Sequence, residues 1–582
     1  MNSPTPAIVT QSAVRPLPRL ALLVFCLAYV LPGFLGREPW KVEDLSAFGV
    51  MRELALGLTD WWEPQLLGLP PEEPGLLPYW MGALAMIALP FLDPETASRL
   101  PFILLLAFTL ACTWYAVYHL ARQPAAQPVA FAFGGEASPR DYARAMADAG
   151  LLALIASLGL ARLSHETTPE LTRLAFATLM LLSMARLGRR GSPWTSVVTA
   201  SLALLALLLS GMGWPAVCLL GGWIVIQLRN GANGDAFGSS IPQADARHRA
   251  ALLSLGALLL VLVALGLRHD WLAVPPWLST TPIDAPEATT SAHTWTSYGR
   301  MLIWFTWPAW PLALWTLWRW RRQLGSLHLA LPLWAVLVGL VDSALAERSD
   351  RALLVALPAF AVLAAFALPT LRRSAAALID WFTLLFFSFC ALVIWVIWVA
   401  MQTGVPAKPA ANVAKLAPGF TPEFSFGLFL LALLATVAWL GLVAWRVGRH
   451  PQAIWKSLVL PASGATLCWL LLMTLWLPLL DFGRSYGPMS RRVASLLPAD
   501  ACVLVDGLSQ AQIAALQHHG GLDVHRIDSQ VAPRCRSLLV DLDQQPTLDE
   551  RVELTHWAFK ATVRRLNDDR RETILLYLRV GG

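Results

Sequence analysis

Residues 376–401 read AALIDWFTLLFFSFCALVIWVIWVAM, and Asp380 is the one charged side chain among them. An apolar run of this length matches the roughly 17–25 residues that an α-helix needs to cross the hydrocarbon core of a membrane. The whole chain has a similar character, since 56% of its 582 residues are hydrophobic and only 14% are charged. A soluble protein carries about a quarter charged residues. The composition therefore excludes a disordered chain and predicts a polytopic membrane protein.

Outward from this segment, similar apolar runs occur along most of the chain. Together they predict a polytopic α-helical membrane protein with about thirteen transmembrane helices. The first of these helices is expected to be retained with its N-terminus in the cytoplasm, because no small-residue cleavage site follows it. The other runs lie near residues 20–35, 101–121, 145–163, 170–187, 195–212, 214–228, 250–267, 301–318, 327–345, 352–370, 425–445 and 457–480.

Basic residues fall on one side of this predicted bundle. If the helices alternate, the loops on that side contain Arg122, Arg144, Arg229, Arg319, Arg322, Arg372, Arg373 and Arg446. The excess of arginine marks the cytoplasmic side of a membrane protein. Topology therefore accounts for the net charge of +6 and the pI near 9.0 better than nucleic-acid binding does, and no nucleic-acid partner is expected.

Two regions are expected on the opposite, periplasmic side of a bacterial inner membrane. Residues 37–100 form a long outer loop within the membrane domain (1–480), and the apolar run 79–92 inside that loop is short enough to be interfacial rather than spanning. Residues 481–582 have the composition of a small soluble α/β domain with a partly parallel sheet. The predicted strands are 502–505, 537–541 and 573–578, and the predicted helices are 510–518 and 548–566.

Cysteines follow the same division. Five of them lie in apolar runs, where a free thiol behaves as a small hydrophobic group. Cys502 and Cys535 both lie in the outer domain. An oxidising compartment would allow these two to pair, and the sequence leaves both the paired and the free states open.

The outer loop is rich in acidic residues that alternate with aromatic ones. Carboxylates beside aromatic rings at a membrane interface suit sugar chemistry, because a partly buried carboxylate can accept a proton from an attacking hydroxyl. The alternative is a solvated loop whose tryptophans anchor it among the lipid headgroups. The acidic residues are Glu43, Asp44, Asp60, Glu63, Glu72 and Glu73.

The order of residues in this loop resembles that of the GT-C membrane glycosyltransferases, closest to the lipid A aminoarabinose transferases and the protein O-mannosyltransferases. The resemblance is carried by residues 36–44 (GREPWKVED), 59–61 (TDW), 68–80 (GLPPEEPGLLPYW) and 97–101 (ASRLP). It differs from the family pattern in two ways. The acidic pair of Glu43 and Asp44 is reversed, and Pro74 stands where the family has a lysine.

This resemblance implies a GT-C fold and an inverting glycosyltransferase. The donor would be a sugar on polyprenyl (undecaprenyl) phosphate, and the acceptor would be lipid A, another envelope glycan or a protein. Glu43 or Asp44 would be the catalytic base, with Glu166 assisting. The donor phosphate would be held by cations, for which the resemblance and the loop positions select Lys41, Arg300, Arg348 and Arg351.

The resemblance also implies a divalent metal, Zn²⁺, Mg²⁺ or Mn²⁺, held by Glu73 and His293. A different class of function is a lipid-linked saccharide transporter or a non-catalytic membrane scaffold. A transporter is expected to carry charges within its spans, and here the main ones are Asp342 and Asp380, near span ends. Carboxylates gathered in the outer loops favour chemistry at the interface. The D-x-D of Asp541 and Asp543 is too common a pattern to assign.

Overall fold

Long apolar helices dominate the computed structural model. It describes the chain except residues 1–4, 40, 188–192, 236–241, 269–291, 347–348, 448–452, 499–500, 530–533, 566–571 and 581–582. Within the described part, 7 helices are long and apolar enough to cross a membrane. The architecture is therefore that of a multi-pass membrane protein, and the count of about thirteen spans stays a prediction.

The chain divides into two units, and each is described by itself. Unit 1 comprises Met1–Pro32, Phe102–Ala391 and Leu433–Leu470, and unit 2 comprises Gly33–Pro101, Leu392–Ala432 and Leu471–Gly582. Four long helices have residues in both units because the chain passes from one to the other within them. They are α4 (Pro94–Ala121), α16 (Arg373–Thr403), α18 (Phe426–Val447) and α19 (Lys456–Leu475).

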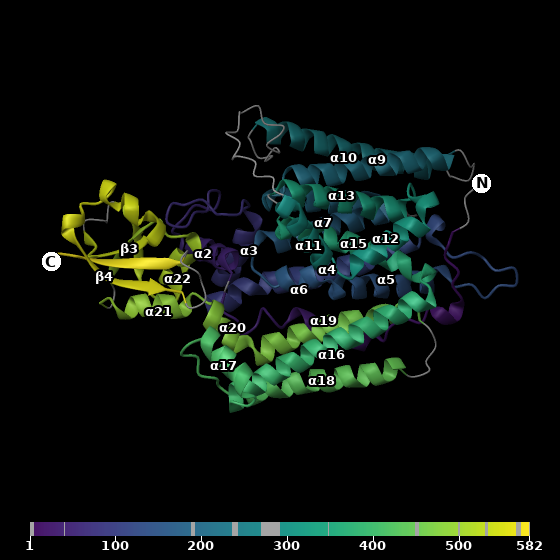
Figure 1. Ribbon diagram of the computed structural model, residues 1–582. Helices are drawn as coiled ribbons and strands as arrows, with labels where there is room; N and C mark the ends of the chain where they lie inside the picture. The colour runs from purple at the N-terminus through teal and green to yellow at the C-terminus, as the bar shows by residue number, and fades with distance from the viewer. Residues whose placement is uncertain are drawn as a thin grey trace. The chain divides into compact units, whose positions relative to one another are not determined.

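Unit 1 is a bundle of helices (Figure 1). The helix pairs α7–α8, α9–α10 and α12–α15 pack against each other, and in Figure 1 α9 and α10 run side by side. The remaining helices of this unit are α1 (Arg19–Val30), α5 (Pro139–Ala156), α6 (Leu158–Leu163), α7 (Pro169–Leu187), α8 (Pro193–Leu209), α9 (Trp214–Asp235), α10 (Pro242–Arg268), α11 (Ala292–Phe305), α12 (Ala309–Arg319), α13 (Leu327–Leu345), α14 (Asp350–Leu353) and α15 (Leu357–Ala367).

Two of the apolar runs in unit 1 are each broken into two helices. The run 145–163 contains the end of α5 and all of α6, which are separated at Ser157, and the run 301–318 is divided between α11 and α12. Pro308 lies in the second break. Proline has no N–H to donate and disfavours a helical conformation in the preceding residue, so a continuous apolar pattern did not produce one continuous helix there.

Unit 2 combines short helices with a five-stranded sheet. Its helices are α2 (Val42–Leu56), α3 (Leu77–Ala88), α17 (Ala407–Leu416), α20 (Leu477–Arg484), α21 (Gly487–Ser495) and α22 (Gln510–His518). The prediction of an interfacial run at 79–92 corresponds to α3, a helix of 12 residues. This length is well below the roughly 17–25 residues needed for a span.

The sheet has the strand order β2-β1-β3-β5-β4. β1 is parallel to both of its neighbours, while β5 is antiparallel to β3 and β4. The partly parallel sheet predicted from the sequence is therefore confirmed, and α22 contacts β2 on one side and α2 on another. The strands are β1 (Cys502–Asp506), β2 (Asp523–Arg526), β3 (Ser537–Asp541), β4 (Trp557–Arg564) and β5 (Thr573–Arg579).

The predicted helix at 548–566 is wrong. Residues 542–550 form a 3₁₀ helix, and Trp557–Arg564 form β4, which pairs along its length with β5. β4 is an edge strand that is mostly exposed. Residues 559–564 (FKATVR) do alternate apolar and polar side chains, which is the pattern of a strand with one face in solvent, and this local signal should have outweighed the helix predicted over 548–566.

The two cysteines of the sheet domain form a disulfide, Cys502–Cys535. Cys502 is the first residue of β1. Cys535 is fully buried in the cluster formed by Leu504, Leu538 and Leu575. Of the two states that the sequence left open, the structure has the paired one, and the cysteines of the apolar runs are free.

Candidate functional site

The start of α2 carries the two acids that the sequence selected. Glu43 and Asp44 lie in its first turn, where the partial positive charge of a helix N-terminus favours carboxylates. Lys41 immediately precedes the helix and is half-buried. The helix ends at Gly57, whose φ of 71° is left-handed and suits a residue without a side chain. Glu43 is half-buried, whereas Asp44 is only 1% exposed.

Asp44 is held by a buried arginine. Nη2 of Arg37 lies 2.9 Å from Oδ2 of Asp44, and Nε of Arg37 donates to the carbonyl oxygen of Gly33 at 2.7 Å. Both side chains of the pair are almost completely buried. A charged hydrogen bond of this kind fixes the geometry of both groups, so the carboxylate of Asp44 is directed at Arg37.

Glu43 has an acidic neighbour instead. Ser46, one turn further along α2, donates from Oγ to Oε2 of Glu72 at 3.3 Å. Burial raises the pKa of Glu72, the hydrogen bond from Ser46 lowers it, and the charge of Glu43 raises it again. A glutamate with a raised pKa takes up a proton more readily than a solvated one, so Glu72 is suited to accepting and holding a proton.

The loop that contains Glu72 is fixed by aromatic side chains. The indole N–H of Trp80 donates to the carbonyl oxygen of Trp61 at 2.6 Å, and the hydroxyl of Tyr79 donates to the carbonyl oxygen of Glu73 at 2.7 Å. The backbone N–H of Leu67 is held by the carboxylate of Glu53 at 3.2 Å. These contacts position Glu73, which is half-buried. Its proposed metal partner, the side chain of His293, lies outside the described residues.

In unit 1, a second charged group forms where α6 leads into α7. Nη1 of Arg351 lies 3.0 Å from Oε2 of Glu166 and 3.6 Å from Oε2 of Glu170. Both glutamates are 2% exposed, and Arg173 lies 3.9 Å from the other oxygen of Glu170. The structure therefore brings together two of the predicted residues, Glu166 and Arg351. Glu170, in the predicted loop, is an additional member of this group.

Among the described residues of unit 1, Arg300 is the predicted phosphate-binding residue that does not join this group. Arg300 is an exposed residue of α11, and Arg348 lies outside the described residues. Within the membrane helices, Asp380 is paired with Arg446 and Asp342 lines a small cavity with Gly339 and Pro358. The charge of Asp380 is therefore balanced by Arg446 within the bundle.

Unit 2 also contains a cavity that the sequence did not indicate. Its volume is about 380 Å³, and its charged lining residues are Glu38, Glu423, Asp481 and Arg491. Aromatic rings complete the wall, from Phe420, Phe424 and Phe482. Apolar walls with a few convergent polar groups are typical of small-molecule sites. Two charged residues that follow the last apolar run, Asp481 and Arg491, were the feature of the sequence that could have pointed to this cavity.

Asp481 is the perturbed carboxyl of this cavity. Burial and the negative charge of Glu38 raise its pKa, the charge of Arg37 lowers it, and the resulting pKa is about 7. One of its carboxylate oxygens is buried without a hydrogen-bond partner. Glu38 is bound by Ser485 and lies 3.9 Å from Arg491. The cavity thus holds a carboxyl that changes protonation near neutral pH.

The structure combines apolar helices long enough to span a membrane, an acidic loop after the first helix and a C-terminal α/β sheet domain, and this arrangement is shared with solved structures of membrane proteins. The particular structures that this chain resembles include two of ArnT from Cupriavidus metallidurans. One, bound to undecaprenyl phosphate, has a TM-score of 0.54 and 14% identity, and the apo form has a TM-score of 0.56 and 15% identity. Each likeness covers 96% of this chain and 96% of the other.

A weaker likeness joins the chain to the archaeal oligosaccharyltransferase AglB from Archaeoglobus fulgidus, with a TM-score of 0.43 and 10% identity. It covers 90% of this chain and 69% of AglB. The sequence matches no protein-family model and no curated protein. The fold expected from the outer-loop motifs is confirmed by the ArnT structures.

Proposed function

We propose that this protein is an inverting GT-C glycosyltransferase of a bacterial inner membrane. It takes a sugar from polyprenyl phosphate and transfers it to a lipid, glycan or protein acceptor on the periplasmic side. The observation that carries the proposal is the ArnT-like fold over nearly the whole chain, since one of those structures holds undecaprenyl phosphate. The acidic start of α2, where that fold's outer-loop motif occurs, supports it.

Glu43 is the base in this proposal. A base has to reach the hydroxyl of the acceptor and must be able to take its proton. Asp44 is buried and committed to Arg37, whereas Glu43 is half-buried beside Glu72. Asp44 and Arg37 then act as a positioning pair that holds the first turn of α2.

The donor phosphate needs positive charge as it leaves, because negative charge accumulates on its oxygens. Arg351 is the candidate in unit 1 for which the structure supports a positioned guanidinium, held by Glu166 and Glu170. An arginine held between carboxylates is fixed in direction, and a phosphate is recognised by N–H groups of such an oriented guanidinium. Lys41, Arg300 and Arg348 remain further candidates for the same role, and Glu73 with His293 remains the candidate metal pair.

Amide substitutions test this assignment of the base. We expect Glu43→Gln to lower glycan transfer by about 10²–10⁴-fold, the usual contribution of general base catalysis. Asp44→Asn is expected to impair folding more than chemistry. Glu63→Gln is the matched control, because Glu63 is an exposed acid of the same loop. The assay is transfer from polyprenyl-phosphate sugars in vesicles containing purified protein, and full activity of Glu43→Gln would reject the mechanism.

A further inference from the structure

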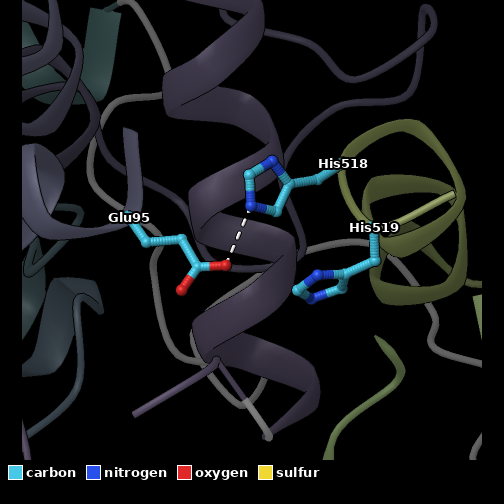
Figure 2. Close-up of side chains that lie close together, drawn as sticks. All are labelled: Glu95, His518 and His519. Carbon is cyan, nitrogen blue, oxygen red and sulfur yellow. Dashed lines mark hydrogen bonds and ion pairs between the residues drawn. The ribbon is translucent and has the colours of Figure 1, made fainter. Parts of the chain in front are cut away.

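Three potential metal ligands meet in unit 2, and none of them is an acid of α2. Glu95 lies in the first turn of α4. His518 is the last residue of α22, and His519 follows it as the helix cap. One ligand atom from each of the three lies within 4.8 Å of the others. Figure 2 shows the carboxylate of Glu95 and both imidazole rings pointing toward the same space.

The carboxylate of Glu95 is oriented on both sides. Its Oε1 lies 2.8 Å from Nε2 of His518, while its Oε2 lies 3.6 Å from Nη2 of the buried Arg99. Arg99 is itself fixed, because its Nη1 donates to the carbonyl oxygen of Phe34 at 3.1 Å. One oxygen is thus held by the protein and the other faces the histidines. Such an outer contact is what commonly orients a metal-binding carboxylate.

The two histidines are positioned by the end of their helix. The backbone N–H groups of His519 and Gly520 both donate to the carbonyl oxygen of Ala515, and Leu522 donates to that of Leu516. These bonds close the C-terminus of α22 in a tight turn. The ring of Phe48 from α2 packs edge-on against His518, with centroids 4.8 Å apart. The turn therefore fixes the backbone of both histidines, and Phe48 packs against the ring of His518.

His519 supplies the independent observation. Its Nε2 is buried and has no hydrogen-bond partner, and a buried polar atom in a native structure normally has one. A ring nitrogen that has no hydrogen-bond partner in the protein is able to coordinate a metal ion.

We propose that Glu95, His518 and His519 bind a divalent transition metal, with Zn²⁺ as the expected ion. Two imidazole nitrogens and one carboxylate form a known zinc ligand set that leaves a fourth position for water or a substrate oxygen. The bound ion connects α22 of the sheet domain to the first turn of α4. This site is distinct from the pair of Glu73 and His293, with which it shares no residue.

The second group of ligand-type side chains in unit 2 does not compete. It consists of Cys502, Asp523 and His525. Cys502 is already bonded to Cys535, so it has no thiolate to offer a metal. Among the described residues these two groups are the ones with three or more ligands close together.

Zinc titration of the full-length protein in detergent tests the proposal. The protein is stripped with a chelator, and Zn²⁺ binding is measured in competition with a chromophoric chelator. In Glu73→Gln, which removes one ligand of the other candidate pair, we expect one Zn²⁺ per chain and a rise in Tm on binding. His518→Ala and His519→Ala should each weaken binding at least about tenfold. His556→Ala is the matched control and should bind as the wild type does, because His556 is an exposed histidine paired with Glu553.

A ligand-preserving variant separates loss of a ligand from loss of folding. In His519→Cys the thiolate replaces the imidazole, so we expect Co²⁺ to bind and to give a sulfur-to-metal charge-transfer band. Absence of Zn²⁺ binding by the folded wild-type protein would overturn the proposal. Unchanged binding in the double variant His518→Ala/His519→Ala, or loss of binding in Glu73→Gln alone, would also overturn it. Binding is read without any transfer assay, so its failure is distinct from failure of the proposed enzymatic function.

Discussion

Arg37 and Asp44 form a buried ion pair, so the stability of the folded protein depends on keeping both residues. Their side chains are 4% and 1% exposed and 2.9 Å apart. Removing one partner of a buried ion pair leaves an uncompensated charge, which typically costs about 3–5 kcal/mol. We therefore expect Arg37→Ala to lower the free energy of unfolding by this amount, measured by thermal or denaturant unfolding in detergent. The double variant Arg37→Ala/Asp44→Ala should recover most of the loss, and a double variant as unstable as the single one would contradict the pairing.

Asp481 makes the stability of the protein depend on pH. Its pKa is raised from 3.8 to about 7, so the folded protein binds a proton that the unfolded chain has released at intermediate pH. Its contribution to stability is present below pH about 4 and is lost as the pH rises through about 7. Asp481→Asn should therefore match the wild type in Tm at acidic pH and exceed it at pH 8–9. Equal Tm differences at both pH values would contradict the raised pKa.

At the residue scale, the sequence identified acids but not their partners. Glu43, Asp44, Glu166 and Arg351 were selected by loop position and by resemblance. Glu166 and Arg351 are 185 positions apart, and no local pattern indicates that they form an ion pair. The same holds for His518 and Glu95, which are 423 positions apart. Contacts of this range arise from tertiary folding, which spacing along the chain does not encode.

Helices α2 and α22 approach so closely that there is no room for a side chain at Gly49 of α2. A Cβ added to Gly49 would lie 2.7 Å from the Cβ of Ala514 and 3.1 Å from a methyl of Leu66. Overpacking of this kind usually costs about 1–3 kcal/mol. We expect Gly49→Ala to lower the unfolding free energy by that amount. The matched variant Gly49→Ala/Ala514→Gly should restore it, and if the second change gives no recovery the close approach of the two helices is wrong.

The disulfide between Cys502 and Cys535 can be tested by mass spectrometry and by substitution. Intact mass in denaturant should rise by about 2 Da on reduction, because one disulfide takes up two hydrogens. Cys502→Ser is expected to cost about 2–4 kcal/mol of stability, while Cys390→Ser serves as a control because Cys390 is free. A thiol titration that finds both Cys502 and Cys535 free in the oxidised protein would contradict the pairing.

Elements were predicted well where apolar patterns are strong and poorly where they are weak. β1, β3 and β5 are buried strands, and each was predicted within a residue of its end. β4 was missed although residues 559–564 alternate apolar and polar side chains, because the prediction extended one helix from 548 to 566 across them. Helix breaks such as that between α11 and α12 were also missed, since hydrophobicity continues through them and only Pro308 marks the interruption.

For the whole molecule, the membrane character and the GT-C fold followed from composition and from the outer-loop motifs. The fold is confirmed by likeness to ArnT over 96% of both chains. Identity of only 14–15% leaves the substrate to be decided by the site, because a fold hosts many specificities. The reversed order of Glu43 and Asp44 and the proline at position 74 are where this chain departs from the family pattern, so the sugar and acceptor need direct measurement.

Mass spectrometry of envelope lipids, glycans and glycoproteins tests glycosyl transfer most directly. Cells with the gene are compared with cells lacking it, and the latter are complemented with wild type, Glu43→Gln or Glu63→Gln. We predict that one glycosylated species disappears without the gene, returns with wild type and Glu63→Gln, and stays absent with Glu43→Gln at equal protein levels. Identical envelope glycans with and without the gene, or full restoration by Glu43→Gln, would contradict the account.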